Sequence, residues 1–368
     1  MLKNKKIILS LLLLLLTACG GTANSVDDIG MVVFKKESSE DSLQKINDAK
    51  LYYNSEVKEY ANLKHGVYKN TKFNNSDNSI VVDEFSCILQ VYKEDGSAKT
   101  INPCDDLKGN WIIESINFDN DNTYLTISSV STGQQSKKIL RKLDSDYQKV
   151  QDYELDEAII LTKIDNDTLY YVYDSENKDG EYSSILSKRK LSETTETKLY
   201  EFDDETTISN ILVNSEKVNV IIENLEDNIV KISEVKENEL IDLEQIASDE
   251  TFIFDSLKIE DGSTMVTYGV VSSESNEESN NPIIDVNSEI GLMKIDNNNK
   301  VTLLSNICDG VVPSLTSTNM YCINSKEINV VNYSDLSKSK MSLPKDLKLE
   351  EDQLLNYNFS FFNKKDDK

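Results

Sequence analysis

Apolar and polar residues alternate along most of this chain, from about Gly66 to the C-terminus. A period of two predicts half-buried β-strands, because successive side chains of a strand point to opposite faces. Turns rich in Asp, Asn, Gly and Ser separate the short runs. The clearest runs cover residues 78–82, 123–127, 168–173, 217–222, 264–268 and 320–323. Residues 66–368 are therefore expected to form one all-β domain.

The β-rich runs recur at a regular interval. Landmarks in the second run of each group are 44 to 56 residues apart and lie at Ile80, Tyr124, Tyr170, Val218, Met265 and Tyr321. One unit contains four predicted strands, at residues 157–164, 168–173, 182–190 and 197–202. Four strands in each unit of roughly 40–50 residues are typical of propeller blades. We therefore expect a β-propeller of about six four-stranded blades; five or seven blades, a pair of β-sandwiches and a solenoid are the alternatives.

Two Asp-rich turns carry a family resemblance. Phe118-Asp119-Asn120-Asp121-Asn122 and Ile164-Asp165-Asn166-Asp167 each lie between the first two predicted strands of a unit. They resemble the strand–turn–strand of TolB-type propeller repeats, in which an aromatic residue and an Asp-Gly turn precede the second strand, although the glycine is missing here. The resemblance covers about two repeats and implies architecture only.

A different pattern precedes the β-rich region. Over residues 39–65, apolar side chains fall at spacings of three, four and seven, which predicts one amphipathic helix. The apolar positions are Leu43, Ile46, Tyr53, Val57 and Tyr60. The helix is expected to pack on the main domain, with binding of a partner as the alternative. Residues 19–38 are mostly small and polar and are expected to form a tether, in which residues 31–34 dock as a short strand.

Charge and composition narrow the classes of function. The chain has 368 residues, with 39 Lys and Arg against 65 Asp and Glu, so its formal net charge is −26. Phosphate contacts need clustered basic residues, so we expect no nucleic-acid partner. The one histidine, His65, is expected at the end of the predicted helix, where it would interact with the helix dipole rather than act in catalysis.

No motif for catalysis or for metal binding stands out. The sequence contains no Walker loop and no G-x-S-x-G, H-E-x-x-H or C-x-x-C motif. The Asp-rich turns do not fit an EF-hand loop, and Asp and Asn favour turns because they bond their own backbone. Trp111 and the 17 tyrosines fit strand packing, with an aromatic ligand surface as the alternative. We expect no catalytic residue, no metal site and no cofactor.

The N-terminus has the form of an export signal. Three lysines precede an apolar run over residues 7–16, which is too short to span a bilayer and matches the h-region of a signal peptide. The next residues, Leu16-Thr17-Ala18-Cys19, resemble the lipobox of bacterial lipoproteins. The resemblance implies that residues 1–18 are removed and that Cys19 becomes the lipidated first residue. Fatty-acyl chains such as palmitate would then anchor the protein in a membrane.

The same resemblance implies a location in the cell envelope, facing the periplasm or the cell exterior. Gly20 follows the cysteine. In lipoproteins of enteric-type bacteria, Asp at this position tends to retain the protein in the inner membrane. The outer membrane is therefore favoured if the organism has two membranes.

The four cysteines beyond Cys19 are expected to form two disulfides, because an exported chain meets an oxidising compartment. Cys87 and Cys104 lie on one predicted hairpin with a two-residue Asp95-Gly96 loop. That register makes them a facing, non-hydrogen-bonded pair with Cα atoms about 4.5 Å apart. Cys308 and Cys322, 14 residues apart, would form the second disulfide. Four buried free thiols are the alternative.

Together these features favour an exported, lipid-anchored propeller that binds or scaffolds at the membrane surface, because propellers present loops and loops carry binding. Its partners would be the membrane, through the lipid anchor, and a protein or glycan of the envelope. The alternative is a propeller-type hydrolase or lyase that acts on an envelope or extracellular polymer. Convergent carboxylates in a cleft would favour the enzyme, and an exposed apolar or aromatic patch would favour the binding protein.

Overall fold

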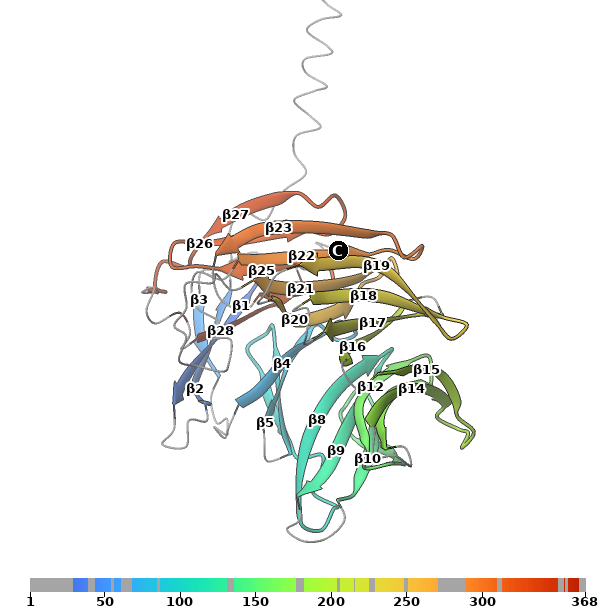
Figure 1. Cartoon of the computed structure of the whole chain (residues 1–368). Helices are drawn as coiled ribbons and strands as arrows, with labels where there is room; N and C mark the ends of the chain where they lie inside the picture. The colour runs from blue at the N-terminus through green and yellow to red at the C-terminus, as the bar shows by residue number, and fades with distance from the viewer. Residues whose placement is uncertain are drawn as a thin grey trace, which may run out of the picture.

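The computed structural model describes residues 29–38, 44–53, 56–60, 68–84, 87–130, 136–176, 182–203, 206–214, 216–224, 229–247, 251–270, 289–309, 313–349, 354 and 357–363. Every regular element in these ranges is a β-strand. The strands form seven four-stranded antiparallel sheets, which are the blades of a β-propeller (Figure 1). None of the described ranges holds a helix long and apolar enough to cross a membrane.

Six blades follow one another along the chain, each running from its inner to its outer strand. Blade 1 contains β4 (Tyr68–Asn74), β5 (Ser79–Glu84), β6 (Ile88–Lys93) and β7 (Ala98–Ile101). Blade 2 contains β8 (Asn110–Asp119), β9 (Asn122–Val130), β10 (Lys138–Leu143) and β11 (Lys149–Leu155). Blade 3 contains β12 (Ile159–Asp165), β13 (Thr168–Glu176), β14 (Tyr182–Lys190) and β15 (Thr197–Phe202).

The next three blades repeat this arrangement. Blade 4 contains β16 (Thr206–Asn214), β17 (Lys217–Asn224), β18 (Ile229–Lys236) and β19 (Glu239–Ala247). Blade 5 contains β20 (Thr251–Lys258), β21 (Thr264–Val270), β22 (Glu289–Ile295) and β23 (Val301–Asp309). Blade 6 contains β24 (Ser314–Leu315), β25 (Asn319–Ile323), β26 (Glu327–Asn332) and β27 (Lys338–Ser342).

Blade 7 joins the two ends of the described chain. Its inner strand, β28 (Tyr357–Phe361), pairs with β1 (Met31–Ser38), and β2 (Gln44–Tyr53) and β3 (Glu56–Glu59) complete the sheet. Figure 1 shows the red β28 beside the blue strands β1 to β3. Backbone hydrogen bonds between the first and last strands thus close the ring.

The expected count of about six blades is corrected to seven. All six sequence landmarks lie in the second strand of a blade, in β5, β9, β13, β17, β21 and β25. The repeat spacing therefore identified the six blades that are continuous in sequence. It missed blade 7 because the inner strand of that blade lies at the opposite end of the chain from the other three.

The helix predicted over residues 39–65 is wrong where the structure describes this segment, because residues 44–53 and 56–59 are β2 and β3. The helical spacing skipped Ala49 and Leu51, which share one face of β2 and are buried against blade 1. Tyr52 points to the other face and packs against blade 6. The expected tether over 19–38 likewise ends in β1, a full strand of blade 7.

The hydrophobic core is divided into seven clusters, one between each pair of neighbouring blades. A middle strand consequently buries side chains on both faces, and every residue of β5 is buried. This explains why the second strand of each blade has the most continuous apolar run in the sequence.

Five inner strands carry the same irregularity. In blades 1 to 5, the pairing of the first strand with the second shifts by one residue, as in a β-bulge. The residues skipped by the pairing are Lys69, Glu114, Ile160, Ser209 and Phe254. A bulge redirects the side chains that follow it. The residues after these bulges line the central channel of the propeller.

Candidate functional site

A cavity of about 720 Å³ lies at the centre of the ring. Its walls come from the inner strands of blades 1 to 5 and from Leu315 of blade 6, and it reaches the first turns of blades 1, 2, 3 and 5. A smaller cavity of about 110 Å³ shares Lys72, Phe73, Asp255 and Leu315 with the first. These four residues therefore border both cavities.

Two ion pairs cross the channel. Lys72 Nζ of blade 1 donates to Asp255 Oδ1 of blade 5. Lys258 Nζ of blade 5 donates to Asp165 Oδ1 of blade 3, at 2.7 Å. Neither pair joins neighbouring blades, so these side chains meet inside the channel.

Lys163 is the third cation of this group. It lines the same cavity from β12, and its ammonium makes no hydrogen bond or ion pair with the described ranges of the chain. Burial lowers the pKa of Lys163, and the charges of Lys72 and Lys258 add to this effect, whereas Asp255 and Asp165 oppose it. The Lys163 side chain is half-buried: protein surrounds it, but it lines the open cavity and is exposed there. Glu114, Asp119, Asp121 and Glu260 line the same cavity, so its carboxylates outnumber these three lysines.

Neutral polar groups form the wall beside these charges. Ser115 Oγ and Thr162 Oγ1 lie 3.1 Å apart and link blade 2 to blade 3. Asn117 Nδ2 donates to Thr162 O at 3.3 Å, and Asn210 Nδ2 donates to Ser256 Oγ at 3.3 Å, which links blade 4 to blade 5. All five residues line the cavity. Because hydroxyl and amide groups both donate and accept hydrogen bonds, this wall suits a polar ligand.

The sequence interpretation did not single out these lysines. Lys72 and Lys163 each lie three residues after the bulge of an inner strand, within Thr71-Lys72-Phe73 and Thr162-Lys163-Ile164. Lys72 and Lys163 share a sequence pattern: each is flanked by strand-forming residues and is followed by an Asp- or Asn-rich turn. The partnership of Lys72 with Asp255 depends on ring closure, which no local pattern shows.

The Asp-rich turns lie at the rim of the cavity and have the local structure expected of turn residues. Asn120 and Asn166 adopt φ values of +52° and +49°, in the left-handed region that Asn tolerates. Asn120 Nδ2 donates to Asp119 Oδ1 at 3.3 Å within the same turn. In the described ranges, no group of three His, Cys, Asp or Glu side chains is arranged to hold a metal ion.

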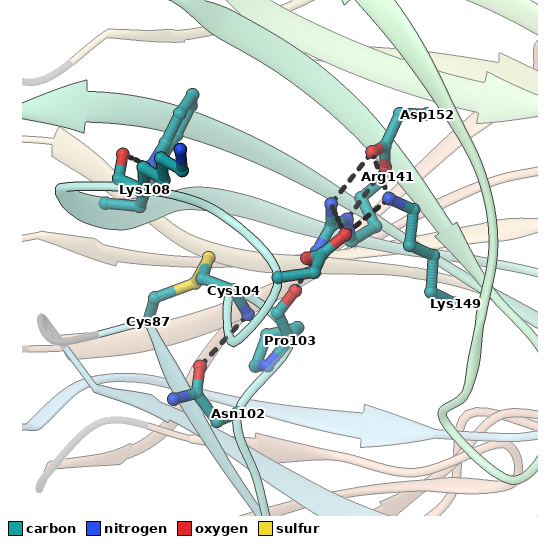
Figure 2. A network of polar contacts seen from close by, with 10 residues as sticks. Cys87, Asn102, Pro103, Cys104, Lys108, Arg141, Lys149 and Asp152 are labelled. Carbon is teal, nitrogen blue, oxygen red and sulfur yellow. Dashed lines mark hydrogen bonds and ion pairs between the residues drawn. A yellow bond between two sulfur atoms is a disulfide. The ribbon is translucent and has the colours of Figure 1, made fainter.

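A second polar network lies away from the channel and centres on Arg141 of β10 (Figure 2). Its guanidinium donates to Asp152 at 2.7 and 2.8 Å, to Asp106 at 2.5 and 3.2 Å, and to Pro103 O. Lys149 Nζ also contacts Asp106 and Asp152, at 2.6 and 2.7 Å. These contacts hold the segment between β7 and β8 on blade 2, which indicates a structural role.

Cys87 and Cys104 lie at disulfide distance, with Cα atoms 6.1 Å apart (Figure 2). The hairpin register behind this prediction is wrong by one residue. Tyr92 pairs with Ala98, and Lys93 N donates to Ser97 O, so the loop has three residues. Both cysteines lie beyond the ladder, in the segments that flank β6 and β7, and can therefore approach each other without facing in the sheet.

Cys308 and Cys322 also lie at disulfide distance, with Cα atoms 6.5 Å apart. Cys308 is in β23, the outer strand of blade 5, whereas Cys322 is in β25, the second strand of blade 6. This pair therefore links neighbouring blades, in contrast to the pair at Cys87.

Cys19, His65 and Trp111 were also singled out in the sequence, and the structure describes one of them, Trp111. Cys19, the signal peptide over 1–18 and His65 lie outside the described residues. Trp111 is half-buried in β8, packs against the core between blades 1 and 2, and donates from Nε1 to Lys108 O at 3.0 Å. These contacts fit the strand-packing interpretation.

Comparison with known proteins supports the fold. A puromycin hydrolase superposes with a TM-score of 0.54 at 9% identity, over 90% of this chain and 56% of that chain. A puromycin-hydrolyzing peptidase of Mycobacterium tuberculosis gives 0.54 at 10% identity, over 91% of this chain and 54% of that chain. The WD40 domain of Neurospora crassa Pan2 gives 0.48 at 8% identity, over 82% of this chain and 90% of that chain. At these identities the likeness to the two hydrolases shows the β-propeller fold alone.

The chain spans about half the length of the two hydrolases that it resembles. No protein-family model matches the sequence, and no curated protein is a significant match to it.

Proposed function

We propose that this protein is an exported, lipid-anchored propeller of the cell envelope whose central cavity binds a small polar ligand. The observation that carries the proposal is the cavity of about 720 Å³. Ligand sites typically have volumes of roughly 300–1,000 Å³ and combine apolar walls with a few placed polar groups. Here Phe73 and Leu315 supply apolar wall, and the lysines and hydroxyl groups supply polar contacts. The ligand would derive from a protein or glycan of the envelope.

A hydrolase or lyase is the second candidate, because two of the similar structures, each with a TM-score of 0.54, are hydrolases. A triad that uses histidine would have to use His65, the one histidine of the chain. Glycoside hydrolysis needs two carboxyl groups that are free to act. Asp165 and Asp255 line the cavity, but lysines hold both in ion pairs. Glu114, Asp119, Asp121 and Glu260 also line the cavity, so the hydrolase or lyase stays as the second candidate.

Filling the cavity tests the binding function. Ser209 lines the cavity from β16, whereas Thr207 is exposed on the same strand, so Ser209→Phe has a matched control in Thr207→Phe. Each protein would be purified from its own envelope and denatured, and the released small molecules would be identified by mass spectrometry. We expect one compound, near one equivalent, in the wild type and in Thr207→Phe but not in Ser209→Phe. The absence of such a compound, or equal amounts in all three proteins, contradicts the proposal.

The same released compound separates binding from hydrolysis. Incubated with the purified protein, a bound ligand should be recovered unchanged. Conversion of the compound by the wild type, and not by Ser209→Phe, would instead establish the hydrolase or lyase.

A further inference from the structure

We infer that Lys163 is the anion-binding residue of the central cavity and that the ligand carries a single carboxylate. This inference rests on the proposed function and names the chemical class of the ligand. It starts from an imbalance of charge. Lys72 and Lys258 are each matched by an aspartate, whereas the Lys163 ammonium has no partner in the described ranges.

An unmatched ammonium inside a protein is costly unless an anion reaches it. A chain with a net charge of −26 has many carboxylates, yet none of the described ones forms an ion pair with the Lys163 ammonium. The open cavity gives a ligand access to this amine. A carboxylate that enters the cavity would provide the missing charge-assisted hydrogen bond.

The surrounding charges favour a monoanion over a dianion. Asp165 and Asp255 lie near Lys163, and their charges act on its pKa. One negative charge matches the Lys163 ammonium, and a second would be repelled by these two aspartates and by Glu114, Asp119, Asp121 and Glu260, which line the same cavity. A carboxylate therefore fits the site better than a phosphate monoester, which carries close to two charges at neutral pH.

The neutral polar side chains of the cavity indicate the chemistry of the rest of the ligand. Ser115, Asn117, Thr162, Asn210 and Ser256 surround the charged group with hydroxyl and amide side chains. These groups pair equally well with sugar hydroxyls and with the amides of a peptide end. Both kinds of ligand have a carboxylate attached to a group that forms hydrogen bonds. The test distinguishes the two sources, an acidic sugar and an acylated amino acid.

Binding should depend on pH in a defined direction. Burial and the neighbouring lysines lower the pKa of Lys163 in the free protein, so the amine loses its proton below the usual lysine value of about 10.4. Only the ammonium binds a carboxylate strongly, so affinity should fall as pH rises through this lowered pKa. The charged groups that line the cavity around Lys163 are Lys72, Glu114, Asp119, Asp121, Asp165, Asp255, Lys258 and Glu260.

Titration calorimetry with paired probes tests the inference. D-Galacturonate and D-galactose share a sugar ring, and N-acetylglycine and N-acetylglycinamide share an acylated amino acid; within each pair the carboxylate is the main difference. We expect the carboxylate of at least one pair to bind about tenfold or more tightly than its neutral partner, and the pair that shows this identifies the source. If both carboxylates bind no better than their neutral partners, the inference is wrong.

Lys163→Met should remove the preference for the carboxylate, and Lys163→Arg should retain it. The control is Lys236→Met, which removes one positive charge from an exposed position on blade 4 and should keep the preference. Circular dichroism would confirm that each variant folds. If Lys163→Met still prefers the carboxylate probe to its neutral partner, the role of Lys163 is wrong. The cavity would remain the binding site in that case if Ser209→Phe abolishes binding.

Chemical labelling of the wild-type protein tests the same residue without a variant. Acetic anhydride acylates neutral amines, so the unpaired Lys163 should react faster at pH 8 than the paired Lys72 and Lys258, as measured by peptide mapping. The bound carboxylate probe should slow the labelling of Lys163, and the neutral partner should not. Equal labelling with and without the carboxylate contradicts the inference.

Discussion

Arg141 illustrates, at the scale of single residues, how this acidic protein buries a charge. It is among the largest fully buried side chains, and only 1% of it is exposed. Burial of a guanidinium is tolerated only when its donors are satisfied. Asp106, Asp152 and the carbonyl of Pro103 together provide these acceptors. Lys149 contacts the same two carboxylates from the surface.

Because Arg141 is buried and Lys149 is exposed, their replacement should lower the stability of the protein by different amounts. Arg141→Met should lower the free energy of unfolding by about 3 kcal/mol, because it removes one partner of a buried ion pair. Lys149→Met should lower it by less than about 1 kcal/mol, since exposed ion pairs contribute little. Urea denaturation of both variants measures these changes. Equal destabilisation by the two substitutions would show that the buried guanidinium has no special role.

The same network predicts a dependence of stability on acid. Partial burial raises the pKa of Asp106, but hydrogen bonds from Arg141 and Lys149 outweigh this and lower the pKa to about 2. A carboxyl whose pKa falls on folding stabilises the fold above its unfolded value of about 3.9. That contribution is lost as pH falls from about 4 to about 2. The difference in stability between the wild type and Arg141→Met should therefore shrink over this range, and a constant difference would contradict the assignment.

At the scale of elements, β28 carries the closure of the ring. Phe361 of β28 is fully buried and stacks on Tyr321 of blade 6, with ring centroids 4.1 Å apart. Phe361→Ala should destabilise the protein by about 4 kcal/mol, in the range of large-to-small core substitutions. Tyr182→Ala, at an exposed aromatic of blade 3, should change stability by less than about 0.5 kcal/mol. A stability change near zero for Phe361→Ala would argue against the closing blade.

The cysteine pair between blades 5 and 6 is expected to be a disulfide that stabilises the protein. Non-reducing peptide mapping of the mature protein should find Cys308 linked to Cys322 and Cys87 linked to Cys104. The double variant Cys308→Ser, Cys322→Ser should be about 3 kcal/mol less stable, because the cross-link that closes a loop of about 15 residues is lost. Any other linkage, or free thiols at these positions, would contradict the pairing.

The sequence predicted these elements unevenly, for a physical reason. Second strands such as β5 are buried on both faces between two blades, so their apolar runs repeat with the blades and are easy to recognise. The strands β1 to β3 form one sheet with β28, and this long-range pairing leaves no repeat in the sequence. Ala49 and Leu51 carried the strand period in β2, but helical spacing of other residues obscured it.

At the scale of the whole molecule, the candidate site depends on the ring. Lys72, Lys163 and Lys258 come from blades 1, 3 and 5, and only closure of the propeller brings them to one channel. A sequence pattern places each of them on a strand but does not give their neighbours. The site therefore required the structure, whereas the β-propeller architecture followed from the sequence, and both predicted cysteine pairs lie at disulfide distance.

Attachment to the envelope is also a property of the whole protein. Intact mass of the membrane-extracted wild type should show a chain that starts at Cys19 and carries added acyl chains, because the segment ending at Cys19 resembles a lipobox. The Cys19→Ser variant should lose the acyl mass and leave the membrane fraction, since the acyl chains provide the anchor. Recovery of an unmodified chain cut at another site would contradict lipidation at Cys19.

We propose that the channel of the seven-bladed ring is the binding site and that Lys163 receives the carboxylate of the ligand. A crystal structure of the mature protein with D-galacturonate or N-acetylglycine, whichever binds more tightly in the calorimetric comparison, tests this most directly. We predict density for the probe in the cavity of about 720 Å³, with a carboxylate oxygen within hydrogen-bond distance of Lys163 Nζ. An empty channel, with the probe bound elsewhere on the molecule, would show that Lys163 does not bind the carboxylate.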